Sequence, residues 1–182
     1  MEGKAKLFET ERLILRRLEF SDAEEMYNNY CNNDNVTKYL TWATHRSVED
    51  TKEYLEKVAL PRYDTENPYM WALVLKETNQ VIGCIDACYI DLRHKRAEIG
   101  WVLSEKYWGK GLMPEAELVI RDYLFSEGFE RIQAKHDVRN PKSGRAMQKI
   151  GMTHEGTLKK YEFDNNGKLV DYEFYAIVKD EQ

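Results

Sequence analysis

The feature that most constrains the fold is a glycine-bearing loop between a strand-like and a helix-like segment. It lies in RAEIGWVLSEKYWGKGLMPEA, residues 96–116. Alternating apolar residues predict a strand over residues 96–104, and a helical pattern follows over residues 114–127. Gly109 and Gly111 lie between the two, so this part of the chain must pass from a strand into a helix through a tight turn.

A glycine-bearing turn before a helix can bind an anion. The first backbone N–H groups of a helix lack intrahelical partners and carry the positive end of its dipole, and glycines let an anion approach them closely. Here the donors would run from Trp108 through Met113. The spacing matches neither a Walker A loop nor a dinucleotide fingerprint. From this stretch alone, phosphate binding and a purely geometric role for the glycines are equally open.

A second helix start carries the densest basic face of the chain. In NPKSGRAMQKIG, residues 140–151, Asn140 stands at the expected N-cap and is followed by proline. Lys142, Arg145 and Lys149 follow the i, i+3, i+7 spacing of one helix face. Two helix N-termini beside cations suit a ligand with several phosphates, whereas the alternative is an ordinary solvated face.

The remaining segments predict a single α+β domain over residues 1–182. We expect a mixed, mostly antiparallel sheet of about seven strands with helices on both faces. The expected strands cover residues 12–20, a hairpin at 69–91 that turns at 77–80, residues 131–138, and a hairpin at 154–178 that turns at 166–167. The expected helices cover residues 21–30, opened by a Ser21/Glu24 capping box, a short turn at 36–40, and residues 47–60.

Composition excludes several classes of protein. A net charge of −5 argues against a general nucleic-acid binder, and no apolar run approaches the roughly 18 residues of a membrane span. The N-terminus has no apolar signal core, so we expect a cytoplasmic protein. Three cysteines without metal spacing predict buried, inert thiols and no metal site, and the four scattered histidines are interpreted as surface or structural residues.

Four segments, in order, resemble the GNAT superfamily of acetyl-CoA N-acetyltransferases, and its ribosomal-protein N-terminal acetyltransferase branch in particular. They are ETERLILRRLEFSDAEEMY, VIGCIDACYID, RAEIGWVLSEKYWGKGLMPEA and NPKSGRAMQKIGM, and the resemblance spans about residues 10–178. Each segment alone is weakly specific, but the four at this spacing are specific together. Two positions depart from the family loop: Lys106 replaces its usual first residue, and Met113 stands where a small residue is common.

The resemblance implies a GNAT fold in which the fourth and fifth strands, residues 96–104 and 131–138, splay apart. Pantetheine would lie in the gap like an added strand, with Gly100 at a bulge. The implied cosubstrate is acetyl-CoA, and no metal is implied. The residues expected to bind it are Trp101, Val102, Leu103, Trp108, Gly109, Lys110, Gly111, Leu112, Met113, Asn140, Ser143 and Lys149. For the Trp101 side chain, a core position and a place in the pocket wall both remain open.

The reaction needs a neutral amine and a proton for the leaving thiolate. A protein N-terminal amine has a pKa of about 7.7–8.0 and a lysine one of about 10.4, so the former needs less help from a base. Glu98 is the expected base, with Asp86 on the adjacent strand as a rival, although Glu98 could instead serve only as an ion-pair partner. In many members of the superfamily, a tyrosine after the fifth strand is thought to protonate the thiolate, but no tyrosine occurs here between residues 124 and 160. The resemblance to the ribosomal-protein branch implies that Ser143 takes this place beside the sulfur.

The expected function is acetyl transfer to a primary amine in a ternary complex, with a protein N-terminus such as that of a ribosomal protein preferred. A small amine (antibiotic, polyamine or amino-acid derivative) and a non-catalytic acyl-CoA-binding module are the alternatives. The aromatic segment 37–50 would shape the acceptor cleft. We expect no direct nucleic-acid or membrane partner; the resemblance suggests a homodimer, but the sequence does not decide it.

Overall fold

The computed structural model describes residues 5–179. Within them, eight strands form one sheet in the order β1-β2-β3-β4-β5-β6-β8-β7. The strands are β1 (Phe8–Glu9), β2 (Leu13–Arg16), β3 (Met70–Leu75), β4 (Gln80–Asp91), β5 (Arg96–Leu103), β6 (Arg131–Asp137), β7 (Thr153–Phe163) and β8 (Leu169–Val178). The expected mixed sheet is confirmed, with one strand more than predicted because two-residue β1 has too little pattern to be recognised.

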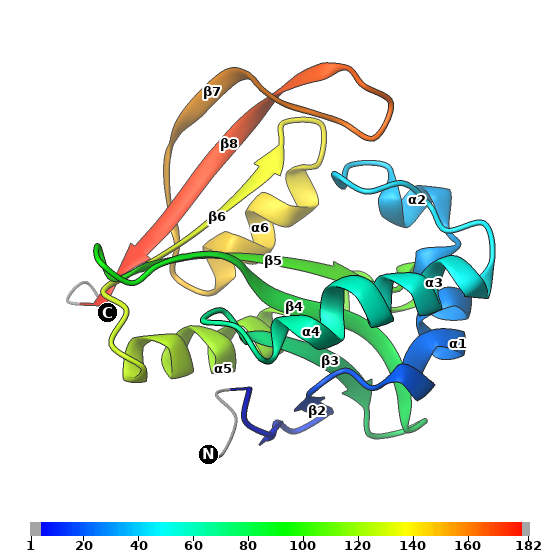
Figure 1. Cartoon of the computed structure of the whole chain (residues 1–182). Coiled ribbons are helices and arrows are strands. Elements are labelled where there is room, and N and C mark those ends of the chain that lie inside the picture. Colours follow the sequence, from blue (N-terminus) through cyan, green and yellow to red (C-terminus); the bar gives the residue numbers. More distant parts are fainter. Residues whose placement is uncertain (1–4, 180–182) are drawn as a thin grey trace.

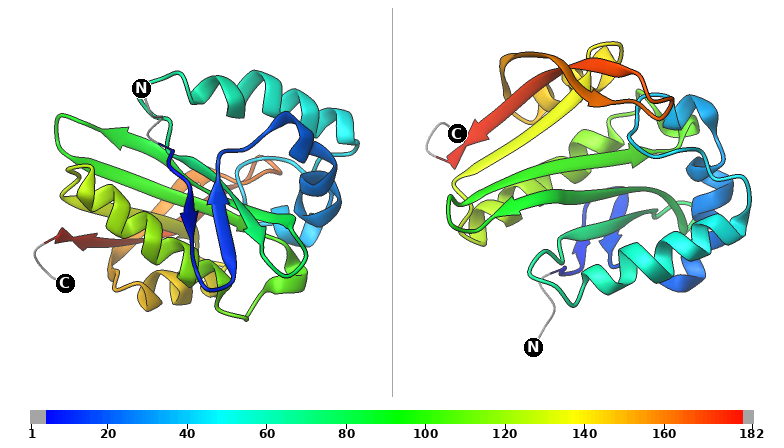
Figure 2. Two further views of the ribbon diagram at one scale, coloured as in Figure 1. Left: turned by 90° about the horizontal axis from the view of Figure 1, so that it is seen from below. Right: turned by 45° about the horizontal axis from the view of Figure 1, so that its top comes forward.

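Helices cover both faces of the sheet, as predicted. On one side lie α1 (Ala23–Met26), η2 (Tyr27–Cys31), α2 (Asp34–Thr37), α3 (Val48–Tyr54), η3 (Leu55–Ala59) and α4 (Leu60–Arg62). On the other lie α5 (Leu112–Ser126) and α6 (Pro141–Lys149). Figures 1 and 2 show the sheet between these two layers, with α3, η3 and α4 running as one continuous coil in front of β3 and β4.

β5 and β6 part soon after they meet. They are parallel neighbours, but they pair only between residues 96–98 and residues 131–133. Beyond Glu98, the two strands diverge into a V that is open along residues 99–103 of β5 (Figure 1). This is the splay that the resemblance implied between the fourth and fifth strands.

The bulge beside the V lies on β4 and not at Gly100. Ala87 pairs with Ile99 and Tyr89 pairs with Glu98, so Cys88 is the extra residue. Gly100 keeps a regular position opposite Asp86. The sequence-based prediction for Gly100 was therefore wrong, because a glycine in a strand can also mark a close approach of neighbouring atoms. Here a Cβ at Gly100 would lie 3.3 Å from the Cys88 sulfur.

One capping box opens the turn after β2 and another opens α3, but the predicted Ser21/Glu24 pair forms neither. Ser47 and Asp50 cap α3 reciprocally. The Ser21/Glu24 box does not form, because the first turn, η1 (Phe20–Asp22), begins earlier and uses Asp22 as the reciprocal acidic residue. Arg16 donates to both Asp22 carboxylate oxygens at 2.8 and 2.7 Å, which holds this carboxylate against the start of the turn.

Close packing at two glycines holds β5 and β6, the two strands of the V, against their neighbours. A Cβ at Gly83 of β4 would lie 2.4 Å from the carbonyl oxygen of Val102, so only glycine lets β5 approach there. A Cβ at Gly144 of α6 would lie 2.7 Å from His136 Nε2 on β6, so α6 sits directly against its strand. No helix within residues 5–179 has the length and apolar character needed to cross a bilayer.

Candidate active site

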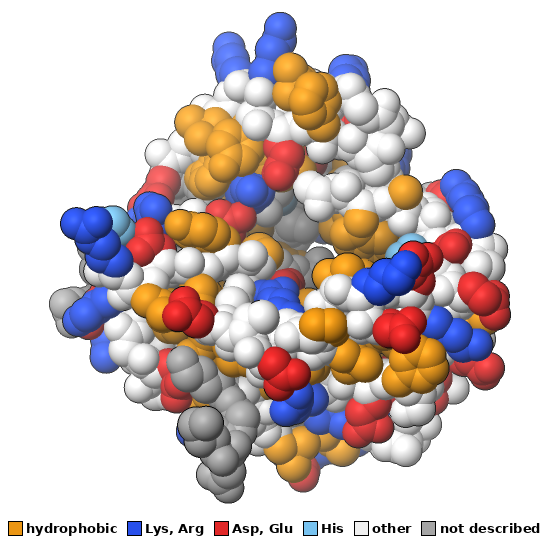
Figure 3. All heavy atoms as spheres, viewed as in Figure 1, with side chains coloured by type: hydrophobic (Ala, Val, Ile, Leu, Met, Phe, Trp, Pro, Cys, Tyr) orange, Lys and Arg blue, Asp and Glu red, His pale blue; other side chains and the backbone are white. Residues whose placement is uncertain are grey.

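A cavity of about 700 Å³ lies where β5, α2 and the N-terminal ends of α5 and α6 converge. In the view of Figure 3, the molecule is hollowed near the centre of this face, between the β7–β8 hairpin and the helices below it. The parting of β5 and β6 creates this space, because no strand fills the V. A slender ligand can therefore lie between two strand edges and reach two helix starts.

The glycine loop forms one end of the cavity. Gly109 and Gly111 have φ of +74° and +77°, a conformation that favours glycine, and Gly111 is the N-cap of α5. No atom outside its chain neighbours lies within 4 Å of where a Cβ at Gly109 would stand. Gly109, Gly111 and the first residues of α5 all line the cavity.

Arg12, the residue directly before β2, holds this loop in place through hydrogen bonds. Its Nη1 donates to the Lys110 carbonyl at 2.9 Å, and its Nε donates to Glu115 Oε2 at 2.7 Å. Burial alone would raise the pKa of Glu115, but hydrogen bonds from Thr10 and Arg12 outweigh it and lower that pKa. The ion pair ties the loop to the first turn of α5.

Eleven of the twelve residues predicted to bind acetyl-CoA line this cavity, and the exception is Lys110. The Lys110 ammonium lies over the Tyr107 ring at 5.1 Å, so only its backbone belongs to the loop. Trp101 is half-buried and lies in the cavity wall, which decides between the two positions left open by the sequence. Lys142 and Arg145 line the same space, so the basic face of α6 borders the cavity.

Asn140 and Ser143 form a pair at the start of α6. Asn140 Nδ2 donates to Ser143 Oγ at 3.0 Å, and both residues line the cavity. Asn140 occupies the N-cap position, but its side chain makes no capping hydrogen bond. Because Ser143 Oγ accepts from Asn140, its own O–H hydrogen is available to another acceptor.

Helix α2 closes the wide end of the V. Asn165 at the tip of the β7–β8 hairpin donates from Nδ2 to the Thr37 carbonyl at 3.1 Å. The Arg139 guanidinium lies 5.7 Å from the centre of the Tyr39 ring, and both line the cavity. The aromatic content of residues 37–50 was the only sequence signal for this roof.

Glu98 stands at the apex of the V with both carboxylate oxygens engaged. Gln133 Nε2 donates to Oε2 at 2.8 Å, and Lys135 Nζ lies 3.1 Å from Oε1. Lys135 also lies 3.3 Å from Glu162 Oε2 of β7. Burial acts to lower the pKa of Lys135, but Glu98 and Glu162 outweigh it and raise the pKa to about 12. Glu98 therefore has partners on β6 and does not line the cavity described above.

Asp86 shares this face of the sheet with Glu98. It lies opposite Gly100 in the β4–β5 ladder, two residues along β5 from Glu98. Arg62 Nη1 lies 2.5 Å from Asp86 Oδ2. Burial raises the pKa of Asp86, although the neighbouring Arg62 works in the opposite direction. Both candidate bases are thus already paired with a cation.

The cysteines and histidines do not build a second centre. Cys31 and Cys84 are buried as predicted, but Cys88 is exposed, because the bulge turns it out of the ladder. Burial raises the pKa of the Cys31 thiol to about 12. Among residues 5–179, no group of three or more His, Cys, Asp or Glu side chains could hold a metal ion.

Residues 12–153 match the family described as Acetyltransferase (GNAT) domain. The chain belongs to the GNAT acetyltransferase family. The glycine loop, the parted strands and the α6 start are thus the parts of a GNAT enzyme, and this protein is an acetyl-CoA-dependent N-acetyltransferase.

Relatives of this GNAT enzyme span almost its whole length. An uncharacterized N-acetyltransferase, p20, of Bacillus licheniformis is 32% identical over 94% of this chain and 96% of its own. The ribosomal-protein-serine acetyltransferase of Escherichia coli is 28% identical, with 95% and 96% covered. The spermidine N(1)-acetyltransferase of Vibrio cholerae is 25% identical, with 92% and 94% covered.

A solved structure connects the GNAT fold to its cosubstrate. The microcin C7 self-immunity acetyltransferase MccE, determined in complex with acetyl-CoA and AMP, superposes with a TM-score of 0.83. It is 26% identical, with 93% of this chain and 94% of that chain covered. Acetyl-CoA as the cosubstrate of this GNAT enzyme is therefore confirmed.

Proposed function

We propose that this GNAT enzyme acetylates the N-terminal amine of a polypeptide. The observation that carries the proposal is the pairing of both nearby carboxylates with cations, Glu98 with Lys135 and Asp86 with Arg62. Neither carboxylate is free to contact the acceptor amine directly, because these cations, and Gln133 at Glu98, already engage them. The acceptor must then be an amine that is substantially neutral near pH 7, and an N-terminal amine with a pKa of about 7.7–8.0 meets this requirement better than a lysine with one of about 10.4.

The two predicted catalytic residues take complementary roles in this proposal. The neutral amine attacks the thioester carbonyl carbon; the new C–N bond forms as the C–S bond breaks. Glu98 receives the proton that the amine nitrogen loses, through a water, because both of its oxygens are engaged. Ser143 directs its O–H toward the departing sulfur and stabilises the thiolate by a hydrogen bond. The thiolate then takes a proton from water, and the proton held by Glu98 returns to the solvent, so CoA leaves as the free thiol.

The backbone of β5 and the two helix starts supply binding. We assign the free edge at residues 99–103 to the pantetheine arm, and the amides at Gly109 and Gly111 to the pyrophosphate. Lys142, Arg145 and Lys149 border the same cavity and offset the phosphate charges. Lys110 contributes through its main chain alone.

A polyamine acceptor is the second candidate, because one relative is a spermidine N(1)-acetyltransferase. A cluster suited to a cation exists beside Glu98: Glu162 and the rings of Tyr161 and Tyr172 surround one position. Lys135 already occupies it, 5.0 and 5.8 Å from the two ring centres. A polyamine would compete with this internal cation, so the cluster favours the peptide acceptor.

An acceptor panel tests the proposal. The protein is mixed with acetyl-CoA and either seryl or alanyl peptides, lysine blocked at its α-amine, or spermidine. Release of free thiol and the mass of the product are measured. We expect acetylation at the peptide N-terminus and little on the other two. Turnover of spermidine alone would contradict the proposal, and acetyl-CoA binding without thiol release for any acceptor would identify a non-catalytic acyl-CoA-binding module.

A further inference from the structure

One edge of β4 is left open beyond the end of β3. β4 runs from Gln80 to Asp91, but its pairing with β3 ends at Asp86. The Ala87 N–H donates to the Tyr69 carbonyl at 2.8 Å, and the Ala87 carbonyl accepts from Asn67 Nδ2 at 2.8 Å. Among the described residues, no strand pairs with this edge from residue 88 to residue 91.

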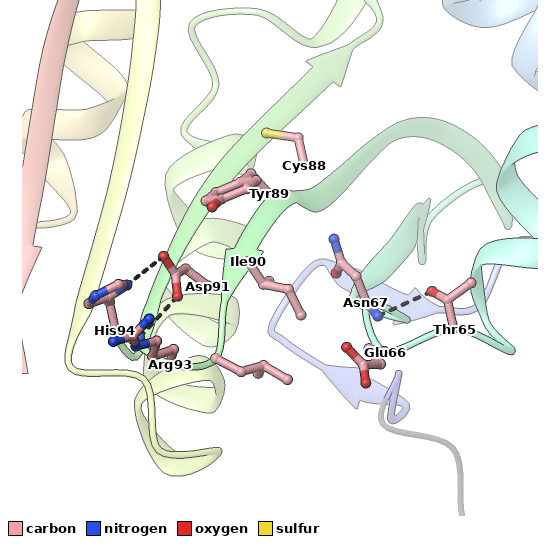
Figure 4. Close-up of a pocket in the computed structure, with 10 residues that line it drawn as sticks. Thr65, Glu66, Asn67, Cys88, Tyr89, Ile90, Asp91, Arg93 and His94 are labelled. Atoms are coloured by element: carbon pink, nitrogen blue, oxygen red, sulfur yellow. Dashed lines mark hydrogen bonds and ion pairs between the residues drawn. The ribbon is translucent and has the colours of Figure 1, made fainter.

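A groove lies along this open edge. It has a volume of about 730 Å³ and is lined by residues 65–67 on one side and residues 88–94 on the other. Figure 4 shows β4 and the segment carrying Thr65 and Asn67 facing each other across it. Tyr89 and Leu92 are 51% and 50% exposed there, an unusual exposure for large apolar side chains next to an unpaired strand.

The inner end of the groove meets the candidate active site. Cys88 lines the groove, and its sulfur lies 3.3 Å from the Glu98 carbonyl oxygen. The same sulfur lies 3.3 Å from where a Cβ at Gly100 would stand, on the face that carries Asp86 and Glu98. A chain whose first residue reaches Gly100 on β5 would pass over β4 at the exposed Cys88 and then enter the groove on the far side of β4.

We propose that this groove holds the acceptor polypeptide downstream of its N-terminal amine, as an extended segment added to the free edge of β4. The inference rests on the proposed peptide acceptor and states where that peptide lies. Main-chain hydrogen bonds to the open edge give affinity without demanding one sequence, and alternate side chains of the peptide contact Tyr89 and Leu92. A small amine fills none of this surface.

Acceptor length tests the proposal. Seryl peptides of two and eight residues are acetylated by the wild-type protein, by the double variant Tyr89→Ala/Leu92→Ala, and by Leu118→Ala. Leu118 is an exposed residue of α5, on the other face of the sheet, and serves as the matched control. The kinetic constants kcat and KM for each peptide, and the Kd for acetyl-CoA, are measured.

We expect wild-type kcat/KM to be at least about tenfold higher for the octapeptide than for the dipeptide, which corresponds to about 1.4 kcal/mol. The double variant should lose this advantage through a higher KM, with the dipeptide constants and acetyl-CoA affinity unchanged, while Leu118→Ala keeps it. Peptide turnover without length dependence, or a double variant that keeps the advantage, overturns the groove and leaves the peptide function standing. No acetylation of either peptide by the wild type overturns the proposed function, and the groove assignment with it.

Discussion

Lys135 Nζ lies 3.1 Å from Glu98 Oε1, at the place where β5 and β6 stop pairing. The same ammonium reaches Glu162 on β7 at 3.3 Å. One internal cation thus joins three strands on the face where the acceptor amine must arrive. Substitutions of Lys135, Glu98 and Glu162 therefore test how these charges affect catalysis and acceptor preference.

Replacing Glu98 by glutamine should lower kcat by about ten- to a hundredfold, because a positioned proton acceptor contributes on that order or more. The acetyl-CoA Kd, measured by calorimetry, should stay near the wild-type value, since Glu98 does not line the cofactor cavity. Glu162→Gln removes the other carboxylate partner of Lys135 and is the control. Equal kcat in Glu98→Gln and wild type would show that Glu98 is not the base.

Replacing Lys135 by methionine should shift acceptor preference toward cations. Glu98, Glu162 and the two tyrosine rings would then surround a position without its internal cation. We expect spermidine turnover to rise at least about fivefold relative to a seryl peptide, which is about 1 kcal/mol of cation binding. Lys135→Arg restores the charge and should restore the wild-type ratio. An unchanged ratio in the methionine variant would mean that the cluster does not face the acceptor.

Removing the Ser143 hydroxyl tests the support of the leaving sulfur. Ser143→Ala should reduce kcat by about tenfold or more, as expected for a lost hydrogen bond to a charged atom. The KM for acetyl-CoA should change little. Ser143→Thr keeps a hydroxyl within reach of Asn140 and should recover most of the rate. The kcat loss is also measured with an acetyl donor whose leaving group is better than the CoA thiolate. An equal loss with that donor would show that the serine acts on binding and not on the sulfur.

Gly111 tests the phosphate turn. At φ of +77°, an alanine is strained by about 1–2 kcal/mol and moves the first amides of α5. Gly111→Ala should therefore weaken acetyl-CoA binding by about tenfold. Gly128, at φ of +97° just past the other end of α5, provides a control with similar strain far from the cavity. Gly128→Ala should lower the thermal midpoint without changing Kd; equal losses of affinity in both variants would argue against a phosphate contact.

The burial of the Glu117 carboxyl group predicts that the stability of the protein depends on pH. It is fully buried in α5, and its carboxylate oxygens have no hydrogen-bond partner among the described residues. Burial raises the pKa of Glu117 from 4.5 to about 8. Between these values the unfolded chain has released a proton that the folded chain keeps, so the free energy of unfolding falls as pH rises.

Glu117→Gln removes this titration. The stability of the variant relative to wild type should therefore increase from pH 4.5 to pH 8, by about 3–5 kcal/mol. Urea unfolding at several pH values measures the difference, and contributions from other titrating groups cancel between the two proteins. Parallel stability curves would show that Glu117 has the same pKa in the folded and unfolded states.

Local patterns predicted the order of the elements, and the family resemblance added most of the residues that line the cavity. The glycine loop, the α6 start and both late hairpins depend on neighbouring residues, so alternation, capping and turn chemistry were enough to locate them. Glycines were harder to interpret, because one residue type serves a positive φ at Gly111 and close backbone approach at Gly83. The bulge was therefore assigned to the wrong strand.

Contacts between distant segments could not be read from the sequence. A nearby cation such as Arg96 could have been the ion-pair partner of Glu98, but Arg96 pairs with Asp91, and the partners of Glu98 come from β6. The α2 roof depends on Asn165 and Thr37, which are 128 residues apart. The brace of Arg12 on Glu115 likewise joins residues that no periodic pattern relates.

The parted strands β5 and β6 also bear on solubility. An unpaired strand edge on a protein surface is a template for another chain, and such edges promote aggregation. Here the two unpaired edges face each other inside the V, and α2 covers its wide end where Asn165 meets Thr37. The unpaired edges of β5 and β6 thus remain available to the substrate but are not exposed to other copies of the chain.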